Sequence, residues 1–213
     1  MLGRSVRGGR PLWWAFALLF PLSWALAARI GDGLAHGGVG TFDPSGFAGY
    51  VTPGAWLAWT TGPLGEEAGW RGYFLPRLLG RFQPLTASLI LGLIWAIWHV
   101  PLYIHSNFST VGRGLDFTAS VICLTILMTI LFHRTRGSLL LAVLFHWSVN
   151  VTPDVVEKVL PGIGQPAGFH QGYSLAALIV VTVVVASVAG GRRLAAGDDF
   201  VVDRDLAGEA VDR

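Results

Sequence analysis

The strongest constraint on this sequence is a succession of apolar stretches, each near the length that a helix needs to cross a lipid bilayer. Such a helix takes about 20 mainly apolar residues. Hydrophobic residues make up 53% of the 213-residue chain and charged residues only 13%, against about 25% in soluble domains. These features predict an all-α, polytopic transmembrane helix bundle of about six spans. The candidate spans are residues 12–28, 50–79, 84–104, 117–132, 138–151 and 173–189.

Arginines at the ends of these stretches predict the orientation. Six crossings would leave only Arg29, Arg113 and Lys158 on one side. Nine arginines would share the other side: Arg4, Arg7, Arg10, Arg77, Arg81, Arg134, Arg136, Arg192 and Arg193. Because cytoplasmic loops are rich in Lys and Arg, we expect an integral protein of the cell membrane with both termini in the cytoplasm. Alternatively, residues 1–28 are a cleaved signal peptide that ends near the "ALA" of residues 25–27.

Length and composition favour one membrane domain over residues 1–193, followed by an acidic, mobile tail over residues 194–213. The net charge is +2 and the basic residues form short clusters, which excludes a nucleic-acid partner and leaves the lipid bilayer. The single cysteine, Cys123, excludes an internal disulfide. The composition indicates no particular oligomeric state.

Ionisable side chains inside the apolar stretches are the candidates for function, because each costs at least ~2.5 kcal/mol at the centre of a bilayer. The set consists of Glu66, Glu67, Arg71, His99 and His146, with the amide of Asn150 beside them.

The spacing of these residues predicts which of them meet. Pro84 favours a turn at residues 82–83, and Glu66 and His99 each lie 15 residues from its borders, at Arg81 and Pro84. Two antiparallel helices would place both about 22 Å from the turn, provided that residues 50–79 form one long helix bent near residues 62–63. We therefore expect Glu66 and His99 to meet at equal depth.

Within the helices, residues four apart share a face. Glu67 should form an ion pair with Arg71, and His146 and Asn150 should point into one cavity. The short span 138–151 should be buried against its neighbours. Glu66 and Glu67 differ by about 100° around a helix, so they should have different tasks.

A carboxylate and an imidazole that meet across two helices can act as a general base for water. A second imidazole and an amide can donate hydrogen bonds to the oxyanion that develops when water attacks a carbonyl. This set predicts hydrolysis of a peptide bond in a peptide or protein substrate that enters from the membrane.

Three motifs carry a family resemblance: Glu66-Glu67-Ala-Gly-Trp-Arg71, Trp95-Ala-Ile-Trp-His99 and His146-Trp-Ser-Val-Asn150. Over about residues 55–151 the chain resembles the CAAX-protease and bacteriocin-processing (Abi) family of intramembrane endopeptidases, which includes the Ras-converting prenyl-protein protease. The departure is Trp95, where the family more often has Phe, and we expect it only to preserve an aromatic wall.

The resemblance implies that Glu66 and His99 activate water, that His146 and Asn150 stabilise the oxyanion, and that Glu67 and Arg71 support the site. A metal-free mechanism is favoured because Asn150 suits an oxyanion hole. The alternative is a zinc site of three ligands with an open position; its ligands would be Glu66, His99 and His146.

Two other functions stay open for a chain with these residues. One is a non-catalytic membrane immunity or scaffold protein. The other is a small proton-coupled transporter in which Glu66 and His99 form a proton relay.

Overall fold

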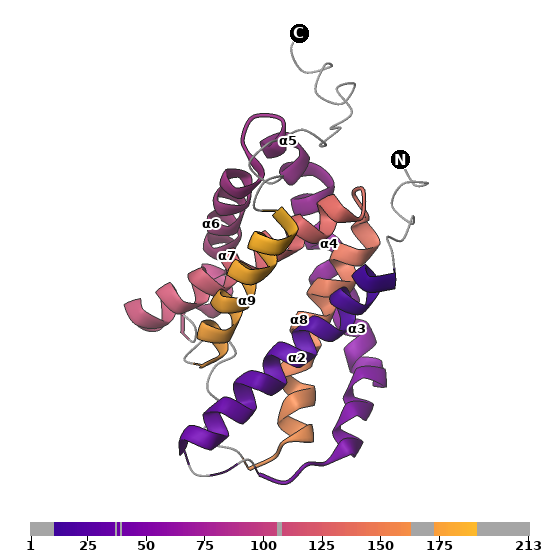
Figure 1. The fold of residues 1–213 in the computed structure, drawn as a ribbon, viewed down its shortest axis with the longest axis vertical. Coiled ribbons are helices and arrows are strands. Elements are labelled where there is room, and N and C mark those ends of the chain that lie inside the picture. Colours follow the sequence, from indigo (N-terminus) through magenta and orange to yellow (C-terminus); the bar gives the residue numbers. More distant parts are fainter. Residues whose placement is uncertain (1–10, 37, 39, 106–107, 163–172, 191–213) are drawn as a thin grey trace, which may run out of the picture.

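The computed structural model describes residues 11–36, 38, 40–105, 108–162 and 173–190, and this part of the chain is helical without strands (Figure 1). The predicted all-α bundle is therefore confirmed. In chain order the elements are α2 (Pro11–His36), the 3₁₀ helix η1 (Pro44–Val51), α3 (Pro53–Thr61), α4 (Pro63–Gly69), the π-helical turn η2 (Trp70–Phe74), α5 (Leu75–Leu79), α6 (Pro84–Tyr103), α7 (Val111–Arg134), α8 (Leu139–Val159) and α9 (Tyr173–Gly190).

Four of these helices are long and apolar enough to cross a membrane: α2, α6, α7 and α8. The two other predicted spans differ. α9 contains a shorter apolar helix, Leu178–Ser187, and residues 50–79 are divided among several elements. The tail over residues 194–213 and five of the nine arginines on the predicted cytoplasmic side lie outside the described residues; these arginines are Arg4, Arg7, Arg10, Arg192 and Arg193.

Side chains at the helix starts explain where α3, α7 and α8 begin. The hydroxyls of Thr52, Thr110 and Ser138 each accept a hydrogen bond from a backbone N–H three residues on, at 3.2–3.4 Å. Such N-caps satisfy backbone donors that a helix leaves unpaired.

Residues 50–79 are not one bent helix. α3 ends and α4 begins at Gly62 and Pro63, which confirms the position of the bend. The segment of residues 50–79 also starts within the 3₁₀ helix η1 and contains the π turn η2. A π turn inserts an extra residue and often marks a functional site, and this one carries Arg71.

Helix α8 is the predicted short span, and it extends beyond residue 151 to Val159 in spite of Pro153. It packs against α2, η1, α4 and α7. Two-thirds of its apolar window is buried, at 67%, so the predicted burial against neighbours is confirmed.

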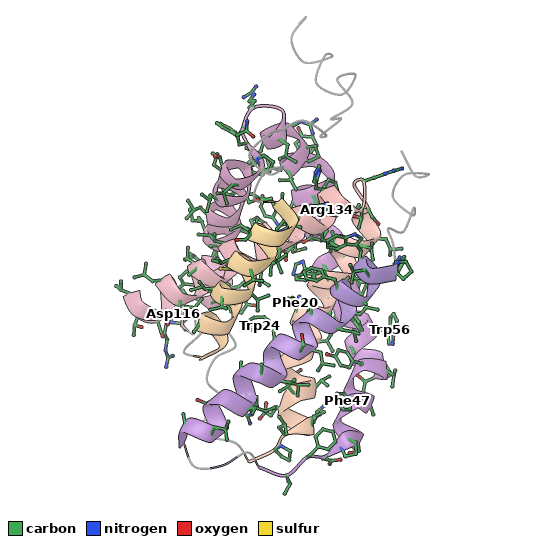
Figure 2. The ribbon with its side chains drawn as sticks, in the orientation of Figure 1. Phe20, Trp24, Phe47, Trp56, Asp116 and Arg134 are labelled. Atoms are coloured by element: carbon green, nitrogen blue, oxygen red, sulfur yellow. The ribbon has the colours of Figure 1, made fainter. Side chains whose placement is uncertain are left out.

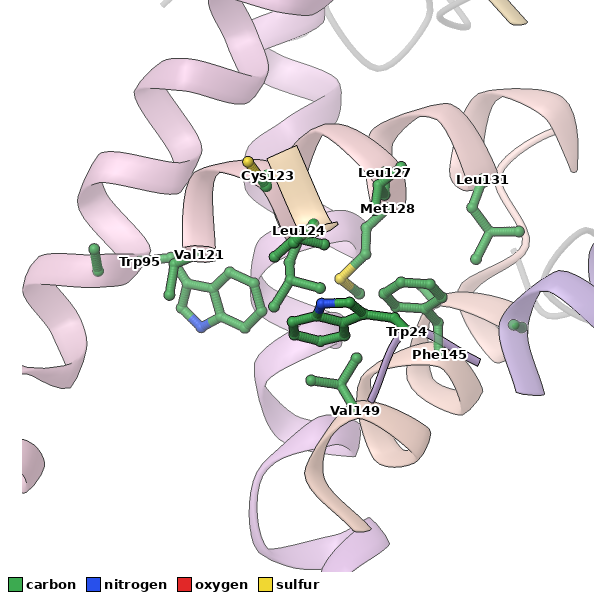
Figure 3. Packing of buried hydrophobic residues seen from close by; sticks show 14 of the residues in the cluster. Trp24, Trp95, Val121, Cys123, Leu124, Leu127, Met128, Leu131, Phe145 and Val149 are labelled. Carbon is green, nitrogen blue, oxygen red and sulfur yellow. The ribbon is translucent and has the colours of Figure 1, made fainter. Parts of the chain in front are cut away.

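The largest apolar cluster joins α2, α6, α7 and α8. Figure 3 shows Trp24, Met128 and Phe145 at its centre and Trp95 at one edge, beside Val121. Aromatic rings from two helices continue it, because Phe145 stacks on Phe16 at 5.6 Å and on Phe20 at 5.9 Å between centroids. In Figure 2, Phe20 and Trp24 lie inside the bundle, whereas Asp116 lies in the first half of α7 and Arg134 at its last residue. The helices that carry the motif residues thus pack around a core rich in aromatic side chains.

Candidate active site

Three helical regions bring the motif residues together in two layers. Glu66 and Glu67 lie on α4, Arg71 on η2, Trp95 and His99 on α6, and His146 and Asn150 on α8. Four of the side chains are buried, namely Glu67, Arg71, Trp95 and His146. Three others reach the surface of the bundle, because Glu66 and His99 are half-buried and Asn150 is exposed.

The buried layer is built on Glu67. Its Oε1 lies 2.9 Å from Arg71 Nη1 and 2.9 Å from His146 Nδ1. The predicted contact between Glu67 and Arg71 is therefore present, and both side chains are 0% exposed. Arg71 Nε and Nη2 and Glu67 Oε2 are buried without a protein partner among the described residues. Each charge of the pair thus depends strongly on the other, since a buried ion without a partner is costly.

In the accessible layer, two indoles hold one oxygen of Glu66. Trp95 Nε1 donates to Oε2 at 2.7 Å, and Trp70 Nε1 lies 3.4 Å from the same atom. Within the described residues, no protein group donates a hydrogen bond to the other oxygen, Oε1. That oxygen is therefore available to a water molecule or substrate.

The imidazole of His99 is oriented by the backbone of its own helix. Nδ1 lies 2.7 Å from the carbonyl oxygen of Trp95. Because a carbonyl only accepts hydrogen bonds, Nδ1 must carry the proton, and in the neutral ring Nε2 is then a proton acceptor. The ring packs between Tyr103 and Phe117, at 5.7 Å and 5.4 Å between centroids, which fixes its plane.

The spacing predicted a direct contact between Glu66 and His99. In the structure each of the two side chains is bonded to Trp95 instead. No hydrogen bond joins Glu66 to His99 within the described residues, although their charges are close enough to interact. Glu66 instead meets the residue one turn before His99 on α6. The estimate of equal depth assumed ideal α-helical rise on both sides of the turn, and the π turn η2 between Glu66 and the turn breaks that assumption.

His146 and Asn150 were expected to point into one cavity, and the structure separates their environments. His146 is 5% exposed and bonded to Glu67, while Asn150 is exposed. An ionised carboxylate only accepts hydrogen bonds, so His146 Nδ1 must carry the proton. Its Nε2 can then donate to an oxyanion only when the ring is doubly protonated, whereas the Asn150 amide donates in any state.

Trp95 is the site residue whose part the sequence did not predict. It is 4% exposed. Besides its bond to Glu66, its ring lies 4.6 Å from the Arg71 guanidinium carbon, 5.6 Å from the His99 ring and 5.1 Å from the His146 ring. The sequence did offer one indication of this part. Trp stands where the family that the chain resembles more often has Phe, and Trp adds an N–H donor.

The part of the chain that carries the motifs is similar to a known protein family. Residues 48–152 match the family described as type II CAAX prenyl endopeptidase Rce1-like. The predicted resemblance is confirmed. The matched region, which is just under half of the chain, is similar to the CAAX-protease family. All three motifs, and Trp95 among them, fall inside the matched region.

A curated relative supports the same assignment. The chain is 31% identical over 98 residues to CAAX prenyl protease 2 of Methanococcus maripaludis. That alignment covers 43% of this chain and 36% of the relative, so the chain spans about a third of the relative's length. The match to this membrane-embedded family, together with four span-capable helices, supports an integral membrane protein.

The alternative of a zinc site in this region depends on which atoms of its three proposed ligands are already bonded. The described residues contain no group of three His, Cys, Asp or Glu side chains arranged to hold a metal ion. His146 Nδ1 bonds to Glu67, and Glu66 Oε2 bonds to Trp95. These bonds leave Glu66 Oε1, His99 Nε2 and His146 Nε2 as the atoms that could bind a metal, so the zinc alternative stays a prediction.

Proposed function

We propose that this chain is an intramembrane endopeptidase that hydrolyses a peptide bond with water activated by Glu66 and His99. The observation that supports the proposal is the pair of oriented proton acceptors in the accessible layer, Glu66 Oε1 and His99 Nε2. Both belong to motifs of the CAAX-protease family, and the relative's name is that of a CAAX prenyl protease. The proposed substrate is a CAAX-type or precursor peptide that enters from the membrane.

The chemistry is a general-base hydrolysis. Glu66 or His99 takes a proton from the water as its oxygen attacks the carbonyl carbon of the scissile bond. The carbonyl oxygen becomes an oxyanion, the C–N bond then breaks, and the proton passes to the leaving nitrogen. The products are a carboxylate and an amine. Because lipid excludes water, the water has to be held and activated at the site itself.

Asn150 is the proposed oxyanion donor, with His146 as a second donor when its ring is doubly protonated. The amide is exposed on α8, on the same helix as His146 and one turn away. Removing one donor of this kind usually lowers turnover by about 10²–10³-fold. Glu67 and Arg71 are proposed to support the site from the buried layer.

The test is hydrolysis of a peptide library by the full-length chain purified in detergent, with prenylated and unprenylated CAAX peptides in separate arms. Glu66→Gln preserves the size of the side chain and removes the base. We expect hydrolysis to fall by at least ~10²-fold, the low end of the contribution of a general base. Mass spectrometry of the products identifies the bond that is cut.

The matched control is Glu157→Gln, the same exchange at an exposed position of α8, which should leave the rate unchanged. Full activity in Glu66→Gln would refute the mechanism. Absence of cleavage by the wild-type chain in every arm would favour the immunity or scaffold protein or the transporter. Activity lost on chelation and restored by zinc would instead support a metalloprotease.

A further inference from the structure

Trp95 lies between the three motifs and contacts residues of each. Its indole N–H donates to Glu66 from the first motif, its carbonyl accepts from His99 on its own helix, and its ring meets His146 from the third. Its ring also lies against the guanidinium of Arg71. One residue thus contacts both the accessible and the buried layers.

The contact with Glu66 determines which carboxylate oxygen remains available. The shorter indole bond goes to Oε2, at 2.7 Å. Oε1 lies on the side of Gly62, where a Cβ would come within 3.3 Å of it. The carboxylate is therefore held from one side by an N–H donor, while a residue without a side chain leaves room on the other.

We propose that Trp95 is a positioning residue for water activation: its indole N–H anchors Glu66 Oε2 so that Oε1 faces the water, and its carbonyl orients His99. This inference rests on the proposed function and adds the device that aligns the two proton acceptors. A hydrogen bond to a charged group is short and directional, and the Trp95 bond is the shorter of the two indole contacts to Oε2, at 2.7 Å against 3.4 Å for Trp70.

The alternative role for Trp95 is packing alone, since its ring lies at the edge of the largest apolar cluster (Figure 3). Phe separates the two roles. A Phe ring preserves an aromatic face toward Arg71 and the histidines, and it removes the N–H together with the second ring of the indole. The protein should therefore remain folded in Trp95→Phe while the anchor of Glu66 is lost.

The kinetic test compares Trp95→Phe with the wild type in the peptide assay. Because Glu66 acts on water and not on the bound peptide, we expect kcat to fall roughly tenfold, the low end for a hydrogen bond to a charged group, with KM within about twofold of the wild type. The control is Trp56→Phe, the same exchange at an exposed position of α3, which should change neither constant. An unchanged kcat in Trp95→Phe, or a loss that appears in KM alone, would overturn the positioning role.

A second measurement does not depend on activity. In the chain labelled with ¹⁵N at its indoles, the Trp95 N–H resonance should lie downfield because it donates to a carboxylate, and Glu66→Gln should shift it upfield. Glu157→Gln should leave it in place. A Trp95 resonance that does not respond to Glu66→Gln contradicts the anchor. A wild-type chain that cleaves nothing overturns the proposed function, and the resonance still decides whether Trp95 holds Glu66.

Discussion

At the scale of single residues, burial gives two adjacent glutamates different surroundings. Glu67 is 0% exposed and accepts from Arg71 and His146. Glu66 is half-buried, and among the described residues it accepts from indoles only. Successive residues of a helix differ by about 100°, so one carboxylate faces the interior and the next faces the accessible side. The pair of charges stabilises the interior, and the single charge remains available for chemistry.

The interior pair predicts a stability effect. Arg71→Ala leaves Glu67 buried without its cation, and breaking a buried pair typically costs about 3–5 kcal/mol. We expect a lower yield of folded chain and a lower melting temperature in detergent, in addition to lost activity. Thermal unfolding followed by size-exclusion chromatography measures this.

The control is Arg81→Ala, at an exposed arginine of the turn before α6. Exposed charges contribute little, so its melting temperature should match that of the wild type. Normal yield and stability in Arg71→Ala would contradict the buried pair.

At the scale of elements, the position of α6 determines where Trp95 and His99 lie. α6 packs on α7 across Gly92, where a Cβ would come within 3.0 Å of Ile122 Cα and 3.1 Å of its Cγ1. Small residues of this kind allow the backbones of membrane helices to approach closely. The absence of a side chain at Gly92 therefore sets the distance of α6 from the rest of the site.

Gly92→Ala should push α6 away from α7. Overpacking of this kind costs about 1–3 kcal/mol, and the shift moves Trp95 and His99 relative to Glu66. We expect a lower melting temperature and a lower kcat in the same preparation.

Gly112→Ala is the matched exchange on α7, since a Cβ there meets nothing within 4 Å. Ala is the better helix former by about 1 kcal/mol, so this variant should be as stable as the wild type or slightly more so. Equal behaviour of the two variants would show that α6 and α7 do not depend on Gly92.

At the scale of the whole molecule, the long helices alternate in direction. In Figure 1 the turn after α5 and the turn between α7 and α8 lie toward the upper end, whereas the end of α2 and the end of α8 lie toward the lower end. The upper turns carry Arg81 and Arg136. Two turns of the predicted cytoplasmic side thus lie at one end of the bundle, as that orientation requires, and the side of the membrane that this end faces stays a prediction.

The orientation can be measured by cysteine labelling, because Cys123 is the chain's one cysteine and is buried. In a Cys123→Ser background, Val111→Cys should react with a membrane-impermeant maleimide in intact cells. Gln83→Cys should react only after the cells are permeabilised. Both positions are exposed, so reaction of both from the same side would contradict the predicted topology.

The structural features that the sequence predicted correctly are local ones. Apolar length predicted the helical bundle, and α6 follows its predicted bounds closely, whereas α7 begins six residues earlier and α8 ends eight residues later than predicted. Gly62 and Pro63 predicted the break, because each disfavours a continuous helix at that point. The i, i+4 spacing predicted the contact of Glu67 with Arg71. Each of these depends on residues within a few positions of one another.

The sequence by itself therefore determined the fold class and the family resemblance, and it named the candidate site residues. Only the tertiary structure decided how they meet: Glu66 bonds to Trp95 instead of His99, and His146 bonds to Glu67 instead of sharing an environment with Asn150. The reason is that contacts between helices depend on the rise, tilt and rotation of each helix. One π turn and one close approach at Gly92 suffice to change which side chain lies opposite another, and neither can be derived from spacing along the chain.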